Sequence, residues 1–141
     1  MRIGRAQVEG MLAQAREGYP FEVCGVLLGV AESPVRVHSV VPVVNREKDQ
    51  PRVRYQIAPE DLIRIQREAR DRGHEIVGYY HSHPDHEARP SETDRRIAAE
   101  GLSDGVIHMV VGVEKGELAV PSAWVFRDPA QSFQEEPLEI E

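Results

Sequence analysis

The sequence predicts an α/β protein with a single mixed β-sheet flanked by helices. Three segments have the apolar spacing or the end signals of helices, and six shorter segments have the character of strands. The two kinds of segment alternate along 141 residues, a length that fits one domain. Alternation within one domain of this size favours a layered structure in which helices cover a sheet.

The first two predicted helices carry clear signals. Residues 5–17 hold apolar side chains at positions i, i+3, i+4 and i+7, namely Val8, Met11, Leu12 and Ala15. Residues 59–73 begin with Pro59, which suits the first helical position, and two acidic residues follow at the positive end of the helix dipole. Gly73 ends this helix, and a shorter third helix is predicted over residues 92–101.

The predicted strands are short and are bounded by turn residues. Valine and isoleucine are frequent in them, and the last two flank the sequence EKGE, which predicts a hairpin turn. The charged stretch 45–52 is predicted to be a loop. The strands comprise residues 21–30, 34–45, 53–57, 75–80, 106–113 and 118–127.

Composition narrows the class of protein. The formal net charge of −7 argues against nucleic-acid binding as the main task. Cys24 is the only cysteine, so an internal disulfide is excluded and a reducing compartment is favoured. The sequence has neither the run of about 20 apolar residues that a membrane span needs nor the apolar stretch of a signal peptide. We therefore expect a cytoplasmic protein with no membrane partner.

The chain is predicted to divide into a domain over residues 1–128 and an acidic C-terminal tail over residues 129–141. The last seven residues, EEPLEIE, are mostly glutamates. Like charges clustered at a chain end favour solvation over packing. We expect this tail to be loosely ordered.

A histidine pair stands at the end of the predicted strand 75–80. His81 and His83 are two residues apart, so both imidazoles point to the same side, away from Ser82. Asp94 follows eleven residues after His83, in the first turn of the third predicted helix. Two imidazoles and a carboxylate supply three metal ligands, and catalytic zinc sites keep the fourth position for water. The pattern predicts a catalytic metal site.

Each part of this pattern has a simpler explanation. Ser91 and Asp94 match the capping box that begins many helices. The histidine pair is a weak signal when taken alone. The joint spacing His-x-His-x7-Ser-x2-Asp is more specific, because residue frequencies give it in fewer than about 1 in 1000 chains of this length. A metal-binding Asp94 is also compatible with the capping box, since the same turn can anchor it.

Taken together, these residues make the sequence resemble the JAMM (MPN-plus) metalloproteases. The motif of that family is a glutamate followed downstream by His-x-His-x7-Ser-x2-Asp. The matching residues are Glu22, His81, His83, Ser91 and Asp94. The resemblance extends over residues 5–126 and is to the short prokaryotic branch. It implies a cytidine-deaminase-like α/β sandwich with one catalytic zinc ion.

The resemblance also implies a role for each motif residue. His81, His83 and Asp94 would be the zinc ligands. Glu22 would be the general acid/base, and Ser91 would donate to the oxygen on which negative charge develops. From the residues alone, Glu22 is typical of a solvated strand end, so its role rests on the resemblance.

The implied reaction is hydrolysis of an amide or isopeptide bond after the C-terminal glycine of a ubiquitin-like or sulfur-carrier protein, the predicted partner. Relatives that cleave polyubiquitin carry long insertions, and 141 residues leave room only for residues 45–52 as a short substrate flap. Three alternatives stay open: a zinc amidase on a small molecule, a deubiquitinase-type isopeptidase, and a non-catalytic scaffold. A homodimer is compatible with the resemblance, but no residue demonstrates one.

The remaining candidate side chains favour structural roles. Cys24 lies in an apolar run and is expected to pack there. His86 lies inside the motif loop, where we expect solvent exposure, with substrate contact as the alternative. The other histidines have no partner at ligand spacing; they are His38, His74 and His108. The aromatic residues expected in the core or along a groove are Tyr79, Tyr80 and Trp124.

Overall fold

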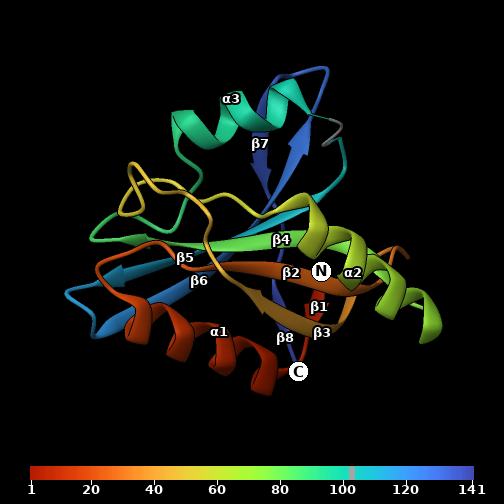
Figure 1. Ribbon diagram of the computed structural model, residues 1–141. Helices are drawn as coiled ribbons and strands as arrows, with labels where there is room; N and C mark the ends of the chain where they lie inside the picture. Colours follow the sequence, from red (N-terminus) through yellow and green to blue (C-terminus); the bar gives the residue numbers. More distant parts are fainter. Residues whose placement is uncertain (102–103) are drawn as a thin grey trace.

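An eight-stranded mixed sheet forms the centre of the computed structural model, which describes residues 1–101 and 104–141 (Figure 1). The strands are β1 (Arg2–Ile3), β2 (Cys24–Val30), β3 (Arg36–Val43), β4 (Glu75–Pro84), β5 (Ile107–Glu114), β6 (Leu118–Arg127), β7 (Ser132–Glu135) and β8 (Glu139–Ile140). Their order across the sheet is β7-β6-β5-β4-β2-β3-β1-β8. The helices are α1 (Arg5–Gly18), α2 (Pro59–Asp71) and α3 (Glu92–Glu100). The predicted fold class, one mixed sheet flanked by helices, is confirmed.

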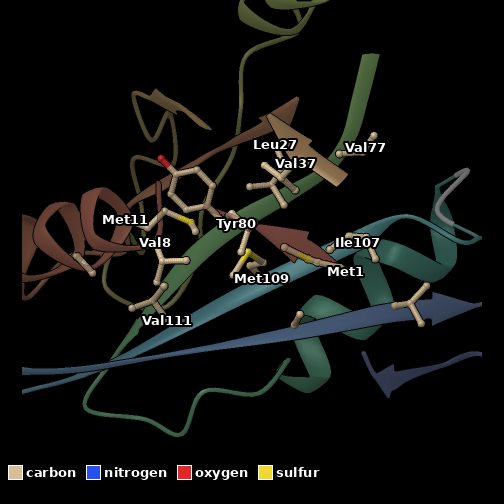
Figure 2. Close-up of a cluster of buried hydrophobic side chains, with 14 of the residues drawn as sticks. Met1, Val8, Met11, Leu27, Val37, Val77, Tyr80, Ile107, Met109 and Val111 are labelled. Carbon is tan, nitrogen blue, oxygen red and sulfur yellow. The ribbon is translucent and has the colours of Figure 1, made fainter. Parts of the chain in front are cut away.

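Two apolar clusters hold helices against the two faces of the sheet. The larger cluster packs α1 against one face and includes Met11, Leu27, Tyr80 and Met109 (Figure 2). The smaller cluster packs α2 against the other face and includes Val26, Ile65 and Ala69. Full burial of a valine, leucine or isoleucine side chain contributes about 1.5–3 kcal/mol, so these clusters provide most of the stabilisation of the layers.

The side-chain alternation along β4 decides which face carries the histidine pair. Tyr80 lies in the larger cluster under α1, whereas Tyr79 packs against the smaller cluster. His81 and His83 follow Tyr79 at two-residue steps and so share its face. β4 is paired with β2 on one side and with β5 on the other, which fixes the end of β4 in the middle of the sheet.

The predicted helices are confirmed with their ends shifted by no more than two residues. Five of the six predicted strands are present as well. The predicted hairpin turn joins β5 to β6 through residues 115–117, where the N–H of Glu117 donates to the carbonyl oxygen of Glu114 (2.9 Å) and Lys115 and Gly116 have positive φ angles of 51° and 73°. No helix in the described part of the chain is long and apolar enough to cross a membrane.

The predicted strand over residues 53–57 is wrong, because this segment has no regular secondary structure. The Asn45 side chain takes the place of a strand partner. Its amide nitrogen donates to the carbonyl oxygen of Arg54 (3.0 Å), and its Oδ1 accepts from the N–H of Gln56 (3.0 Å). One backbone bond, from Arg46 N–H to Gln56 O (2.8 Å), completes the attachment. The segment is therefore held by one side chain rather than by a strand ladder.

The expectation of a loosely ordered acidic tail is also wrong. β7 pairs with β6, and β8 pairs with β1, a two-residue strand that the sequence did not predict. Leu138 and Ile140 pack against the larger cluster, while Glu139 and Glu141 alternate with them toward solvent. The two-residue period of a strand thus separates the apolar side chains of the tail from its charges. The division of the chain at residue 128 stays a prediction.

We expect the double variant Leu138→Ala/Ile140→Ala to lower the free energy of unfolding by about 2–4 kcal/mol, because both side chains lose apolar contacts with the cluster under α1. Urea unfolding followed by circular dichroism measures this change. Glu139→Ala is the matched control, since its exposed side chain makes only a 3.6 Å ion pair with Arg2, and we expect a change below about 0.5 kcal/mol. Equal midpoints for the double variant and the wild type would show that the tail does not contribute to the core.

Candidate metal centre

The side chains of His81 and His83 lie next to each other on one face of β4. Their Nε2 atoms are 3.0 Å apart, and both residues are buried. Ser82 points to the other face, as predicted, and its Oγ accepts a hydrogen bond from the N–H of Val23 (2.9 Å). The Nδ1 of His83 lies 3.1 Å from the carbonyl oxygen of Glu87. Because a carbonyl only accepts, the proton of a neutral His83 is on Nδ1, which leaves the Nε2 lone pair free for a metal.

The first turn of α3 brings the carboxylate of Asp94 to the Nε2 atoms of the two histidines. Ser91 is the N-cap residue: its Oγ accepts from the N–H of Asp94 (3.1 Å), and its own N–H donates to Asp94 Oδ2 (2.8 Å). The capping box predicted from the sequence is thus present. The same Oδ2 lies 3.1 Å from the Nε2 of His81 and 3.1 Å from that of His83.

These three donor atoms form a nearly equilateral triangle with sides of 3.0, 3.1 and 3.1 Å. Tetrahedral ligands about 2.0–2.1 Å from a zinc ion stand about 3.3 Å apart. The triangle is within a few tenths of an ångström of that spacing, and its two imidazoles and one carboxylate are donors that zinc accepts. The residues therefore fit a metal ion of this kind.

The ionisation of His81 and of Asp94 suits metal binding, whereas at His83 a metal ion competes with a proton. Burial lowers the pKa of His81 below its usual value, which keeps this imidazole neutral. Burial acts to lower the pKa of His83 too, but the hydrogen bond and charge of Asp94 outweigh it and raise the pKa. For Asp94, burial acts to raise the pKa, yet the hydrogen bonds from both histidines hold it well below its usual range. A neutral imidazole and an ionised carboxylate are the states that coordinate a metal.

Glu22 lies beside this triangle, just before β2. Its side chain is 5% exposed, and its carboxylate lies within 4.8 Å of the donor nitrogens of both histidines. Glu22 could itself complete a metal site with the two histidines, but Asp94 is closer to both. Oε1 of Glu22 is buried and has no hydrogen-bond partner among the described residues. Burial raises the pKa of this carboxyl group to about 8.

Two residues that the sequence did not single out support the site. Asn45 donates to the backbone oxygen of Glu22 (3.1 Å), and the N–H of Glu22 donates to the carbonyl oxygen of Pro51 (2.8 Å). Tyr55 stacks on the ring of His81 at 4.6 Å between centroids. Both residues lie in the irregular segment that follows β3, and neither matches a catalytic spacing, so only their position in the fold identifies them.

Two cavities border the triangle, one lined by Asp94 and the other by His83. The first, which we call the α3 cavity, has a volume of about 400 Å³ and lies between the segment 47–57 and α3. Its lining includes Tyr55, Ile57, Tyr79, Asp94, Ile97 and His108. The second, the Glu22 cavity, has a volume of about 470 Å³, and its lining includes Glu22, Arg54, His83, His86, Arg89 and Ser91. Arg54 borders both cavities.

The other candidate side chains have mostly structural positions. Cys24 is fully buried, and burial raises the pKa of its thiol to about 12, so it packs as expected. Tyr80 lies in the core and donates to Gln14 (2.6 Å), while Tyr79 lines the α3 cavity. His86 is exposed at the Glu22 cavity, which agrees with the expected solvent exposure.

The three remaining histidines differ in their surroundings. His38 and His74 stack on each other, with ring centroids 4.5 Å apart. His108 contacts the ring of Phe133 edge-on, at 5.0 Å, and lies at the α3 cavity. A structural role was expected for all three and stays a prediction; His108 also lines the cavity that borders Asp94.

Fold and site together define a class, an α/β domain with a metal-compatible cluster at the end of a central strand. The family model of the prokaryotic homologs of the JAB domain matches residues 5–127. The chain therefore belongs to this prokaryotic JAMM/MPN family. The resemblance seen in the sequence is confirmed.

Curated relatives match about two thirds of the chain. A desampylase of Haloferax volcanii is 39% identical over 95 residues, which is 64% of this chain and 67% of that protein. A CysO-cysteine peptidase of Mycobacterium bovis is 36% identical over 93 residues, which is 66% of this chain. The match spans only 62% of the mycobacterial protein's length.

Solved structures match the whole fold. A protein from Desulfitobacterium hafniense has a TM-score of 0.84 at 27% identity, with 99% of this chain and 92% of that one covered. A JAB1/MPN domain protein from Archaeoglobus fulgidus has a TM-score of 0.61 at 19% identity, with 99% and 98% covered. The second likeness supports the fold alone.

The buried imidazole of His108 predicts a pH dependence of stability. Burial lowers its pKa from 6.5 to about 4, so between these values the unfolded chain binds a proton that the folded chain does not. The contribution of neutral His108 to the free energy of unfolding is fully present above pH 6.5. It decreases by about 3 kcal/mol as the pH falls from 6.5 through 4. We expect His108→Phe to remove this part of the acid destabilisation in urea titrations at pH 4 to 7. His86→Ala should retain it, and a profile unchanged by His108→Phe would contradict the assignment.

Proposed function

We propose that this chain is a zinc-dependent peptidase that hydrolyses the amide or isopeptide bond after the C-terminal glycine of a ubiquitin-like or sulfur-carrier protein. The observation that carries the proposal is the convergence of His81, His83 and Asp94 at 3.0–3.1 Å with a buried, unpartnered carboxylate of Glu22 beside them. The names of the two curated relatives, a desampylase and a CysO-cysteine peptidase, support the substrate class.

In this proposal His81, His83 and Asp94 hold the zinc ion. A bound zinc supplies two things at such a site: it polarises the scissile carbonyl and lowers the pKa of a water molecule. The protein contributes the arrangement around it. Tyr55 and the backbone oxygen of Glu87 fix the orientations of the two imidazoles, so the donor atoms are ordered before the metal binds.

Glu22 is proposed to move the proton. Its carboxylate is close enough to the triangle to accept a proton from the attacking water and to pass it to the leaving amine. Its backbone is tied by Asn45 and Pro51 on the two sides, which keeps the carboxylate in place while its Oε1 has no competing partner. A general base that is both fixed and unpartnered loses no hydrogen bond when it accepts the proton.

Ser91 is proposed to stabilise the developing oxyanion. In the capping box its Oγ acts only as an acceptor for the N–H of Asp94, so the hydroxyl hydrogen remains available to donate. Ser91 also lines the Glu22 cavity, next to the donor triangle. One residue can therefore begin α3 and donate to the substrate oxygen at the same time.

The positions of the two cavities assign the two sides of the substrate. Glu22 must reach the leaving amine, and it lines one cavity only, so the leaving group belongs in the Glu22 cavity. The acyl part, which is the carrier tail, then belongs in the α3 cavity. Arg54 lies at the border of both cavities.

Backbone groups of residues that line the α3 cavity are available to pair with the extended tail of a carrier protein. Tyr55 and Ile57 line it, and their N–H and C=O groups make no backbone hydrogen bond within residues 1–101 and 104–141. The alternate residues of this segment are bound to Asn45 and Arg46 on its other side. Strand addition to Tyr55 and Ile57 would hold the tail, and glycines at its end would let the backbone approach the metal. The predicted flap thus includes residues 53–57 as well as 45–52.

The ligand assignment predicts that His83→Ala loses its bound metal, because one of three donors is removed. Metal content by mass spectrometry after purification and dialysis should fall from about one zinc per chain to below about 0.1. His86→Ala is the matched control, since this exposed histidine lies three residues away and outside the triangle, and it should keep its zinc. Stoichiometric zinc in His83→Ala would refute the assignment.

The proposed function is tested with two synthetic ten-residue tails that end in Gly-Gly. One tail is amide-linked to cysteine and the other is linked to a lysine side chain. We expect the zinc-loaded protein to release a peptide ending in glycine, detected by mass spectrometry. Glu22→Gln should lower the rate by about 100-fold or more with zinc retained, because proton transfer is lost.

Ser91 provides the internal control of this assay. Ser91→Ala should lower turnover by about 10- to 100-fold and cost about 1 kcal/mol of stability through the lost cap. Ser91→Thr keeps both the hydroxyl and the cap and should retain activity. Hydrolysis of a simple N-acyl amide with both tails left intact would favour the small-molecule amidase instead. Zinc binding with no hydrolysis of any amide would favour a scaffold.

A further inference from the structure

One polar atom of a residue that lines the α3 cavity has no role in the chemistry described so far. Nε2 of His108 is buried and has no hydrogen-bond partner among the described residues. A buried, unsatisfied nitrogen costs about 1–3 kcal/mol, so such atoms are rare unless something binds to them. The ring itself is fixed, with Phe133 edge-on at 5.0 Å and Tyr79 at 6.1 Å.

The register of the sheet places His108 relative to the donor triangle. His108 on β5 stands opposite Tyr79 on β4, and Tyr79 precedes His81 by two residues. Two residues along a strand and one step between strands correspond to a separation of about 8 Å. An extended peptide advances about 3.3 Å per residue, so the tail residue that passes His108 is the second or third before the scissile bond. In a tail that ends in Gly-Gly the second residue is a glycine, so the third is the one whose side chain can reach His108.

The lining of the cavity indicates which side chain fits there. Ile57, Tyr79, Ile97 and Ala98 provide apolar walls, and Ile97 is 57% exposed, so its side chain is available to a ligand. The imidazole is neutral at physiological pH, because burial lowers its pKa to about 4. Glu47, Arg54 and Asp94 also line the cavity, but the neutral imidazole itself offers no charge to an acidic or basic side chain, so His108 favours an uncharged partner.

We propose that the α3 cavity is the subsite for the third residue before the scissile bond, and that Nε2 of His108 selects there an uncharged side chain ending in a hydroxyl or carboxamide. The inference rests on the proposed function and adds a specificity-determining residue to it. His108 takes no part in the hydrolysis itself. A hydroxyl or a carboxamide can both donate and accept, so either tautomer of the ring can bind it.

The test uses pairs of peptide tails that differ only in whether one side chain ends in a polar or an apolar group. Fluorescein-labelled octapeptides ending in X-Gly-Gly, with X as Thr or Val and as Gln or Met, are titrated against the zinc-loaded wild-type protein and followed by fluorescence anisotropy. Peptides with a free terminal glycine resemble the product and are not consumed. The matching X-Gly-Gly-aminomethylcoumarin conjugates report kcat and KM.

We expect at least one polar member to bind about tenfold more tightly than its apolar partner, with the difference in KM rather than kcat. In His108→Phe the preference should fall to within about twofold, and His108→Gln, which keeps a polar end, should restore most of it. His74→Phe is the matched control, because His74 lies outside both cavities and should keep the preference. Thermal unfolding and zinc content verify that each variant is folded and loaded.

Two results would overturn the inference: equal binding of both members of each pair by the wild type, or a preference that His108→Phe leaves unchanged. Failure of the proposed function is distinguishable from either. If no conjugate is hydrolysed while binding depends on His108, the peptidase is refuted and the subsite stands. If conjugates are hydrolysed with no dependence on His108, the peptidase stands and the subsite is refuted.

Discussion

The position of one carboxylate oxygen constrains the rest of the site. Oδ2 of Asp94 accepts from the N–H of Ser91 at 2.8 Å and lies 3.1 Å from both histidine nitrogens. The same atom thus begins α3 and closes the donor triangle at the end of β4. A shift of α3 would open the triangle, and it would also move Ile97 and Ala98, which form one wall of the α3 cavity. Helix capping, the donor triangle and the shape of the α3 cavity are therefore coupled through Asp94.

The wall of the α3 cavity that is formed by the segment before α2 depends on a second polar residue, Asn45. Asn45 binds the backbone of Glu22, Arg54 and Gln56, so one side chain ties the proposed base to the segment that lines the α3 cavity. In Figure 1 this segment leaves β3 and passes on to α2 without joining the sheet. The free backbone groups of Tyr55 and Ile57 follow from that arrangement, because the anchor is a side chain and not a neighbouring strand.

The sequence was sufficient for the features that depend on local chemistry. Pro59, Gly73 and the Ser91–Asp94 pair predict helix ends correctly, and the spacing of His81 and His83 predicts two imidazoles on one face. The failures involve contacts between distant segments. Residues 53–57 have the composition of a strand, but Asn45 removes the need for a partner. In the acidic tail, glutamates alternate with Leu138 and Ile140. No local signal in the sequence shows that β1 pairs with this segment.

Two of the buried atoms that have no partner among the described residues belong to residues that line the two cavities. Oε1 belongs to Glu22 of the Glu22 cavity, and Nε2 belongs to His108 of the α3 cavity. Burial acts on both, but with opposite consequences. It raises the pKa of Glu22 to about 8, where a carboxyl group exchanges protons near neutral pH, and it lowers that of His108 to about 4, where an imidazole does not. Desolvation is the largest cause of both shifts, and it separates a group suited to the proposed proton transfer from a group suited to the proposed recognition.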